Sequence, residues 1–285
     1  MKPPPFAYRD PTTIEEALAL LAANAEARPL AGGQSLVPML NFRLVHPTML
    51  VDLNRIDDLA GIAIDQAGVT IGAMTRQAEA ERHEGLARGW PLIREALSYV
   101  GHLQTRNRGT IGGSLAHNDP AAELPAVMLA LDATMTIQGV KGVRRVAAER
   151  FFVSTLTTVL DAGELLVSIH LPSAPKGAGF GFAELARRHG DFALAAAAVA
   201  VSRKGGGYAR VVITGMGEGP QRIPEAEAAL IGGGFGDAAI ATAAAAVGTS
   251  VAPGDDLHAP AWYRRRVAGT MTARACRDAI ARMAS

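Results

Sequence analysis

The stretches Ala31-Gly32-Gly33-Gln34-Ser35 and Thr110-Ile111-Gly112-Gly113-Ser114 each place two adjacent glycines and a serine just before an apolar segment. Adjacent glycines lack Cβ atoms, so their backbone can approach a phosphate closely and adopt dihedral angles that other residues avoid. A helix that begins directly after such a loop adds unpaired N–H groups. A single loop of this kind usually serves a turn, but two with matching flanks predict a dinucleotide held between them.

The residues around the first loop support this interpretation. The sequence Thr-Ile-Glu-Glu at 13–16 is a capping-box pattern that opens an amphipathic helix. Residues 28–31 predict a short strand, which the first loop follows directly, and we expect Ser35 to cap a helix that begins near Leu36. A second strand at 49–53 completes a small αβ unit of about fifty residues.

The remaining sequence divides at the proline- and glycine-rich stretch 172–177, which predicts a domain boundary. Before it, the patterns predict a hairpin at 61–65 with 69–73 and helices at 75–82, 91–100 and 121–131. They also predict strands at 133–138 and 164–171, with a helix or turn at 149–152 between them. After it, they predict two strands and three helices, at 192–202, 208–216, 224–230, 237–247 and 260–283. The alanine-rich stretch 192–202 has helical propensity, but its flanking turns and short length favour a strand.

Length and composition exclude several classes of protein. A chain of 285 residues is long enough for two domains, and 28 basic against 27 acidic residues give no bulk attraction to nucleic acid or anionic membranes. No uninterrupted apolar run reaches the roughly 18 residues that a membrane span needs, and the N-terminus lacks the apolar core of a signal peptide. The one cysteine, Cys276, excludes a disulfide framework and a multi-cysteine metal site on this chain. We therefore expect a soluble cytoplasmic protein.

Four motifs together resemble one known family. They are the first loop with Leu36, the stretch Arg106-Asn107-Arg108-Gly109 with the second loop, Asp119-Pro120-Ala121-Ala122-Glu123-Leu124-Pro125, and Arg188-His189-Gly190-Asp191-Phe192-Ala193. The final helix, with Tyr263-Arg264-Arg265, is similar too. The chain resembles the FAD-binding medium subunit of bacterial molybdenum hydroxylases, the family of carbon monoxide dehydrogenase and xanthine dehydrogenase.

The resemblance implies an α+β protein with a two-subdomain FAD-binding fold of the vanillyl-alcohol-oxidase type, followed by a smaller C-terminal α+β domain. The implied bounds are 1–175, with subdomains of about 1–55 and 56–175, and 176–285. It also implies an electron-transfer role for the flavin, with a molybdenum cofactor on a large partner subunit and [2Fe-2S] clusters on a small one. A dimer of heterotrimers is the implied assembly.

The same resemblance implies the cofactor-binding residues. Ala31, Gly32, Gly33, Gln34 and Ser35, with Thr110, Ile111, Gly112, Gly113 and Ser114, would hold FAD through backbone N–H groups and the three hydroxyls. Glu123 matches an acidic position that accepts hydrogen bonds from ribityl hydroxyls, although it also fits a carboxylate that only stabilises a helix start. Leu165 or Leu166 would contact the cofactor. Phe192 matches an aromatic near the flavin ring, or is a core residue.

One departure from the family lies just before Arg188. Several relatives carry a lysine there that approaches the flavin, whereas this chain has Ala183-Glu184-Leu185-Ala186-Arg187. A positive group at that place would stabilise an anionic reduced flavin and raise its potential. Arg187 or Arg188 is a possible substitute.

Other motifs favour ordinary structural roles. His102, His117 and Asp119 lack a third ligand at diagnostic spacing, so we assign no metal. The stretch 234–239 matches a dinucleotide fingerprint, but a helix is expected before it, which favours a helix–helix turn. Neither loop serine lies in a nucleophile elbow, which argues against a hydrolase. Arg264-Arg265-Arg266 favours a solvated or subunit-facing helix. The alternatives for the whole chain are a standalone FAD oxidoreductase and a flavin-free scaffold.

Overall fold

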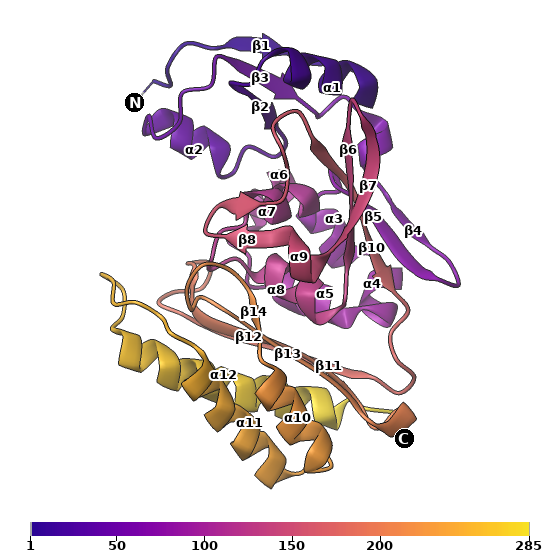
Figure 1. Ribbon diagram of the computed structural model, residues 1–285, viewed down its shortest axis with the longest axis vertical. Helices are drawn as coiled ribbons and strands as arrows, with labels where there is room; N and C mark the ends of the chain where they lie inside the picture. Colours follow the sequence, from indigo (N-terminus) through magenta and orange to yellow (C-terminus); the bar gives the residue numbers. More distant parts are fainter. Residues whose placement is uncertain (1, 285) are drawn as a thin grey trace.

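The computed structural model describes residues 2–284, and Figure 1 shows its chain course. The first layer is a parallel sheet with the strand order β1-β3-β2 and two helices. Thr13 caps the first helix by accepting the N–H of Glu16 at 3.2 Å, which confirms the predicted helix start. The bounds are β1 (Ala7–Arg9), α1 (Ile14–Ala23), β2 (Ala27–Leu30), α2 (Leu36–Asn41) and β3 (Met49–Asp52).

The second layer is an antiparallel sheet with the order β4-β5-β10-β6-β7. Its strands are β4 (Ile62–Ile64), β5 (Gly68–Gly72), β6 (Thr134–Gly139), β7 (Gly142–Ala147) and β10 (Leu165–Pro172). The predicted hairpin and two strands are confirmed, whereas β7 was not predicted. Two adjacent arginines, Arg144 and Arg145, lie in the middle of β7 and interrupt any apolar alternation. A short pair, β8 (Phe152–Ser154) and β9 (Thr157–Thr158), lies apart from this sheet.

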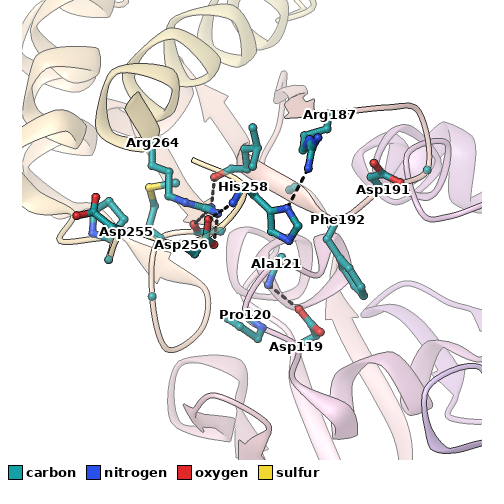
Figure 2. A pocket seen from close by; sticks show the side chains of 18 residues that line it. Asp119, Pro120, Ala121, Arg187, Asp191, Phe192, Asp255, Asp256, His258 and Arg264 are labelled. Atoms are coloured by element: carbon teal, nitrogen blue, oxygen red, sulfur yellow. Dashed lines mark hydrogen bonds and ion pairs between the residues drawn. The ribbon is translucent and has the colours of Figure 1, made fainter. Parts of the chain in front are cut away.

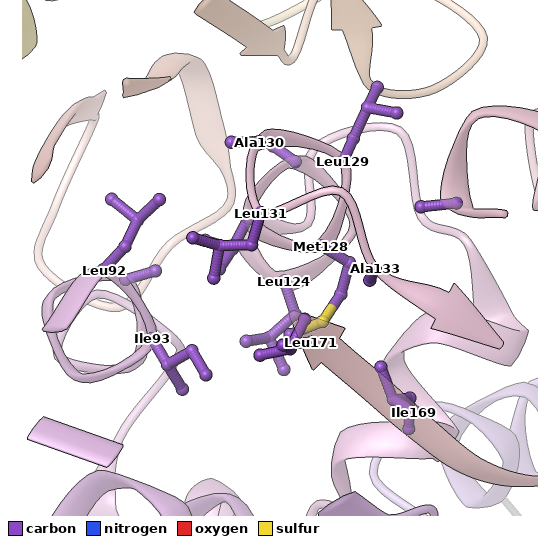
Figure 3. Close-up of a cluster of buried hydrophobic side chains, with 14 of the residues drawn as sticks. Leu92, Ile93, Leu124, Met128, Leu129, Ala130, Leu131, Ala133, Ile169 and Leu171 are labelled. Carbon is purple, nitrogen blue, oxygen red and sulfur yellow. The ribbon is translucent and has the colours of Figure 1, made fainter. Parts of the chain in front are cut away.

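Helices accompany this sheet and build most of its core. They are α3 (Gln77–Arg82), α4 (Glu84–Gly89), α5 (Pro91–Leu97), α6 (Leu103–Arg108), α7 (Ile111–His117), α8 (Glu123–Ala130) and α9 (Ala148–Phe151), with a 3-10 turn, η1 (Asp57–Leu59). Figure 3 shows side chains of α5, α8 and β10 meeting in this core. Every residue of α8 is buried, so this helix is a central element rather than a surface one. The sequence did not predict α6, because it buries none of its side chains.

The C-terminal layer is an antiparallel sheet in the order β11-β12-β13-β14, with three helices on one face (Figure 1). The elements are β11 (Gly179–Ala186), β12 (Ala193–Ser202), η2 (Lys204–Gly206), β13 (Tyr208–Thr214), β14 (Gln221–Arg222), α10 (Pro224–Gly232), α11 (Asp237–Ser250) and α12 (Ala261–Ala281). Gly181 lets α12 approach β11, since a Cβ atom there would lie 3.0 Å from the carbonyl carbon of Ala275. The alanine-rich stretch is a strand, as predicted.

The other face of the C-terminal sheet contacts α5 and α8, so the sheet separates two hydrophobic cores. All ten residues of β12 are buried. Ala196, Ala198 and Ala200 pack into the core of Figure 3. The alternate residues Ala195, Ala197, Val199 and Val201 pack against α10, α11 and α12. Small side chains suit this strand because helices cover both of its faces.

Two motifs of the C-terminal part differ in outcome. Gly234 and Gly236 lie in the turn between α10 and α11, which confirms the helix–helix turn. The expectation for the arginine run was wrong at Arg264, which is buried. Its guanidinium donates to the carbonyls of Leu194 and Gly215 at 2.9 and 3.1 Å and pairs with Asp256 at 2.5 Å. Between residues 2 and 284, no helix is long and apolar enough to cross a membrane.

Candidate flavin site

The two glycine loops lie against each other. A Cβ atom on Gly32 would lie 2.8 Å from Cα of Gly109, just before the second loop. A Cβ atom on Gly113 would lie 3.6 Å from Cβ of Ala31. The fold therefore brings together two loops that lie about eighty residues apart in the sequence, as the two-loop prediction requires.

The first loop leaves a run of backbone donors without protein acceptors. The N–H groups of Gly32, Gly33, Gln34 and Ser35 form no hydrogen bond within the described chain. Gly33 has φ of +73°, a conformation that glycine adopts without strain. Consecutive free N–H groups that include a left-handed residue form a concave site for an anion.

Ser35 differs from the expectation. It precedes α2, but its side chain makes no capping hydrogen bond and its backbone is already helical, with φ of −103° and ψ of −48°. The Ser35 side chain is exposed, and its hydroxyl is therefore available to another partner. Gln34 turns back on the loop, where its side-chain amide donates to the carbonyl of Gly32 at 3.1 Å.

The second loop divides into an anchoring half and an accessible half. The N–H groups of Ile111 and Gly112 donate to the carbonyls of Thr75 and Ala73 at 2.9 and 2.8 Å, so they are occupied by the protein. Ile111 is fully buried. A Cβ atom on Gly112 would lie 2.8 Å from both Cα and O of Ala73. These two residues hold the loop in place, and their N–H groups are not available to a ligand. Fewer residues of this loop than expected can therefore donate a backbone hydrogen bond to FAD.

The accessible half consists of Gly113 and Ser114. Both are partly exposed, whereas Thr110 is buried and caps α7 by accepting the N–H of Gly113 at 3.0 Å. The hydroxyl of Ser114 forms no hydrogen bond within the described residues. In this loop the groups accessible to a ligand are thus Gly113, which lacks a Cβ atom, and the free hydroxyl of Ser114.

Two buried carboxyl groups lie where α8 and its neighbouring helices meet the C-terminal sheet. Glu123 begins α8 and is only 6% exposed, and burial raises its pKa to about 7. Burial, helped by the charge of Glu123, raises the pKa of Glu184 on β11 to about 8. The Oε2 atom of Glu184 is buried without a hydrogen-bond partner among the described residues. Burial therefore favours the protonated form of both carboxyl groups. In the sequence, Glu184 stands out only as part of the departure from the family.

The apolar candidates divide between core and surface. Leu165 and Leu166 are 3% and 6% exposed and lie in hydrophobic clusters of the protein itself. Phe192 is 66% exposed, so the alternative of a core residue was wrong.

Phe192 instead lines a cavity of about 650 Å³, shown in Figure 2. The loop with Asp119 forms one wall of the cavity. Arg187 and His258 form another, with Nη1 of Arg187 3.3 Å from Nδ1 of His258. The ion-paired Arg264 and Asp256 also line the cavity. The cavity lies between the loop before α8 and the C-terminal sheet, so a ligand there would touch both parts of the chain. No group of three or more His, Cys, Asp or Glu side chains suited to a metal occurs within residues 2–284.

These residues fit an FAD molecule in three respects. The free N–H groups at residues 32–35 suit a diphosphate. Gly113 is partly exposed and lacks a Cβ atom, so a ligand can approach its backbone closely. The unpartnered Oε2 of Glu184, with Glu123 nearby, supplies buried acceptors or donors for polar ligand atoms.

Comparison with known proteins identifies the class. A family model described as "FAD binding domain in molybdopterin dehydrogenase" matches residues 4–174. A second, "CO dehydrogenase flavoprotein C-terminal domain", matches residues 180–279. The chain belongs to this family of FAD-binding molybdenum hydroxylase subunits, which confirms the resemblance and the α+β fold class.

Particular relatives cover the whole chain. The 6-hydroxypseudooxynicotine dehydrogenase complex subunit alpha of Paenarthrobacter nicotinovorans is 42% identical over 99% of this chain and 97% of its own. The carbon monoxide dehydrogenase medium chain of Afipia carboxidovorans is 40% identical over 99% of both. Among solved structures, carbon monoxide dehydrogenase from Hydrogenophaga pseudoflava matches with a TM-score of 0.97 and 39% identity over the full length of both chains. Quinoline 2-oxidoreductase from Pseudomonas putida 86 gives 0.94 and 38% over the same coverage.

Proposed function

We propose that this chain binds FAD and passes electrons from the iron–sulfur clusters of a small partner subunit to an external acceptor. The observation that carries the proposal is the run of free N–H groups at residues 32–35 beside the accessible half of the second loop. The complexes of the relatives support it, because carbon monoxide dehydrogenase and nicotine 6-hydroxylase both include a chain of this kind.

The proposed contacts follow the division of the loops. Residues 32–35 would donate to the diphosphate, Ser114 would add a hydroxyl, and Gly113 would allow close approach. Glu123 would form hydrogen bonds with the ribityl chain, and Phe192 would lie beside the flavin ring. When bound, FAD supplies both one- and two-electron exchange. The protein supplies binding, orientation and two protonatable carboxyl groups.

The division of labour between subunits is part of the same proposal. Cys276 is the chain's one cysteine and is buried in α12, so the clusters require ligands from another chain. We infer that a large subunit holds the molybdenum cofactor and oxidises the substrate, and that the complex is a cytoplasmic dimer of heterotrimers. Relatives of this chain belong to enzymes named for carbon monoxide, glyceraldehyde, caffeine and nicotine, and we infer that the large subunit determines the substrate.

The test is coexpression of this chain with the products of neighbouring genes, followed by purification through a tag on this chain. About one FAD per chain, with iron–sulfur absorbance from copurified subunits, is the expected result. An isolated chain that carries FAD and is active alone would replace the proposal with a standalone oxidoreductase. A complete complex without flavin would leave a scaffold role.

A further inference from the structure

Arg76 connects the two glycine loops, although it belongs to neither. It precedes α3 and is half-buried. One guanidinium nitrogen donates to the carbonyl of Arg108, just before the second loop. The other donates at 2.6 Å to Oδ1 of Asn54, whose Nδ2 donates at 3.0 Å to the carbonyl of Ala31 in the first loop. A single side chain therefore spans the place where the loops meet.

The charge of Arg76 has no carboxylate partner. Arg76 forms no ion pair within the described chain. Asp52 is the acidic group that influences its charge, and the two oxygens of Asp52 already accept hydrogen bonds from Tyr8 and from Asn54. Burial, together with the charge of Arg108, lowers the pKa of Arg76 below its usual value. The fold thus keeps two cationic side chains near each other beside the loops.

The guanidinium also has unused donors. Arginine carries five N–H groups, and the two contacts above use two of them. Arg106, two residues before Arg108, is committed elsewhere: it pairs with Glu81 at 2.8 Å and donates to the carbonyl of Val100 at 3.0 Å. Arg108 itself is exposed rather than half-buried. Arg76 is therefore the half-buried cation at the loops that still has donors to offer.

Neither glycine loop contains a cation. Their ten residues are uncharged, and their free N–H groups contribute dipoles rather than net charge. A diphosphate brings two negative charges, and desolvating them between two loops is costly without a counter-charge. Building on the proposed FAD site, we propose that Arg76 is the counter-ion of the FAD diphosphate and also fixes the spacing of the two loops through Asn54 and Arg108.

The variants Arg76→Gln and Arg76→Lys test this in the full-length chain freed of flavin. The matched control is Arg55→Gln, which removes an exposed arginine that pairs with Asp10 at 2.8 Å. Fluorescence titration with FAD, ADP and riboflavin, at low and high salt, gives each dissociation constant. FAD and ADP carry the diphosphate, whereas riboflavin does not.

We expect Arg76→Gln to weaken the binding of FAD and of ADP about 10- to 100-fold, which is the usual effect of losing a charge-assisted hydrogen bond. Riboflavin binding stays the same, the salt dependence of FAD binding becomes flatter, and Arg76→Lys restores part of the loss because it keeps the charge. Arg55→Gln matches the wild type.

Unchanged FAD and ADP affinity in Arg76→Gln would overturn this inference while leaving the FAD site intact. An equal loss for riboflavin would also overturn it, since that loss reports collapsed loops rather than missing charge. If Arg76→Gln does not fold, Arg76→Lys provides the test. Wild-type FAD affinity of Arg76→Lys at high salt, together with weakened FAD affinity at low salt, would contradict the counter-ion role. A wild-type chain with no FAD affinity would instead overturn the proposed function itself.

Discussion

The side-chain oxygen of Thr110 accepts a hydrogen bond of 3.0 Å from the backbone N–H of Gly113, and a Cβ atom on Gly113 would lie 2.6 Å from that same oxygen. A side chain at residue 113 therefore disturbs the cap of α7 and enters the space beside Ala31. We expect Gly113→Val to abolish FAD retention, measured as flavin per purified chain. Gly232→Val is the control, because a Cβ atom at that helical glycine meets nothing within 4 Å. Stoichiometric FAD in Gly113→Val would contradict the assignment of the loop.

Gly112 should respond differently from its neighbour. Its missing Cβ atom accommodates the backbone of Ala73, so Gly112→Ala forces α7 away from the end of β5. We expect the free energy of unfolding to fall by about 1–3 kcal/mol, the usual cost of overpacking. Urea denaturation of the flavin-free chain measures this value. A loss of FAD affinity with unchanged stability would show that Gly112 contacts ligand instead.

The pKa of Glu184 makes the stability of the flavin-free chain depend on pH. Its folded pKa of about 8 lies above the ordinary value of 4.5, so the folded chain keeps a proton that the unfolded chain loses between these values. Stability therefore falls as pH rises from about 5 to about 8, by at most about 1.4 kcal/mol per pH unit for one group. We expect Glu184→Gln to flatten this decline in melting temperature, whereas the exposed Glu26→Gln leaves it unchanged. An equally steep decline in Glu184→Gln would exclude a neutral carboxyl group at residue 184.

Phe192 and Phe182 offer a contrast between a surface and a core aromatic. Phe192 is 66% exposed, so Phe192→Ala should change the free energy of unfolding by no more than about 0.5 kcal/mol. Phe182 is 5% exposed and its ring lies 5.4 Å from that of Tyr99, so Phe182→Ala should cost about 3–5 kcal/mol. In the assembled complex, Phe192→Ala should alter the rate at which reduced enzyme is reoxidised by an acceptor dye. An unaltered rate would remove Phe192 from the flavin end of the site.

Arg264 secures the wall of the cavity in Figure 2. Arg264→Met leaves the carbonyls of Leu194 and Gly215 without their donor, and we expect a loss of about 2–4 kcal/mol of stability. Arg266→Met is the control, because Arg266 lies on the same helix with an exposed side chain, and this substitution should lose almost nothing. Equal effects of the two substitutions on the melting temperature would show that the run acts only through its total charge.

The layers of this fold were accessible from the sequence where local patterns suffice. The cap at Thr13 and the strand of residues 192–202 each carry their own signal, and both formed as expected. The glycine loops carry a local signal too, but the expected capping by Ser35 was wrong. The strand β7 and helix α6 were missed, because two arginines interrupt the apolar pattern of β7 and polar residues dominate α6. For the site, the pattern indicated both loops but not the role of each residue within them.

The missing part of the site arises from contacts between distant segments. Asn54 and Arg76 lie 22 residues apart, and each is an ordinary polar residue after a strand. Only the fold places them between the loops. Glu184 gives a comparable case, because its altered pKa depends on burial and on Glu123, 61 residues away in the chain. Ser35, in contrast, had a local capping signal that the structure did not use.

The strand β12 has a consequence for anyone who edits this protein. Its odd-numbered residues from Ala195 to Val201 complete one core and its even-numbered alanines complete the other, although the strand lies after the proposed boundary at 175. A shortened chain that ends at 175 would leave α8 uncovered, and we expect it to aggregate. A chimaera that exchanges the C-terminal part between two relatives would place the donor's even-numbered β12 residues in the hydrophobic core of the recipient's N-terminal part. The modular unit of exchange in this family is therefore the whole chain.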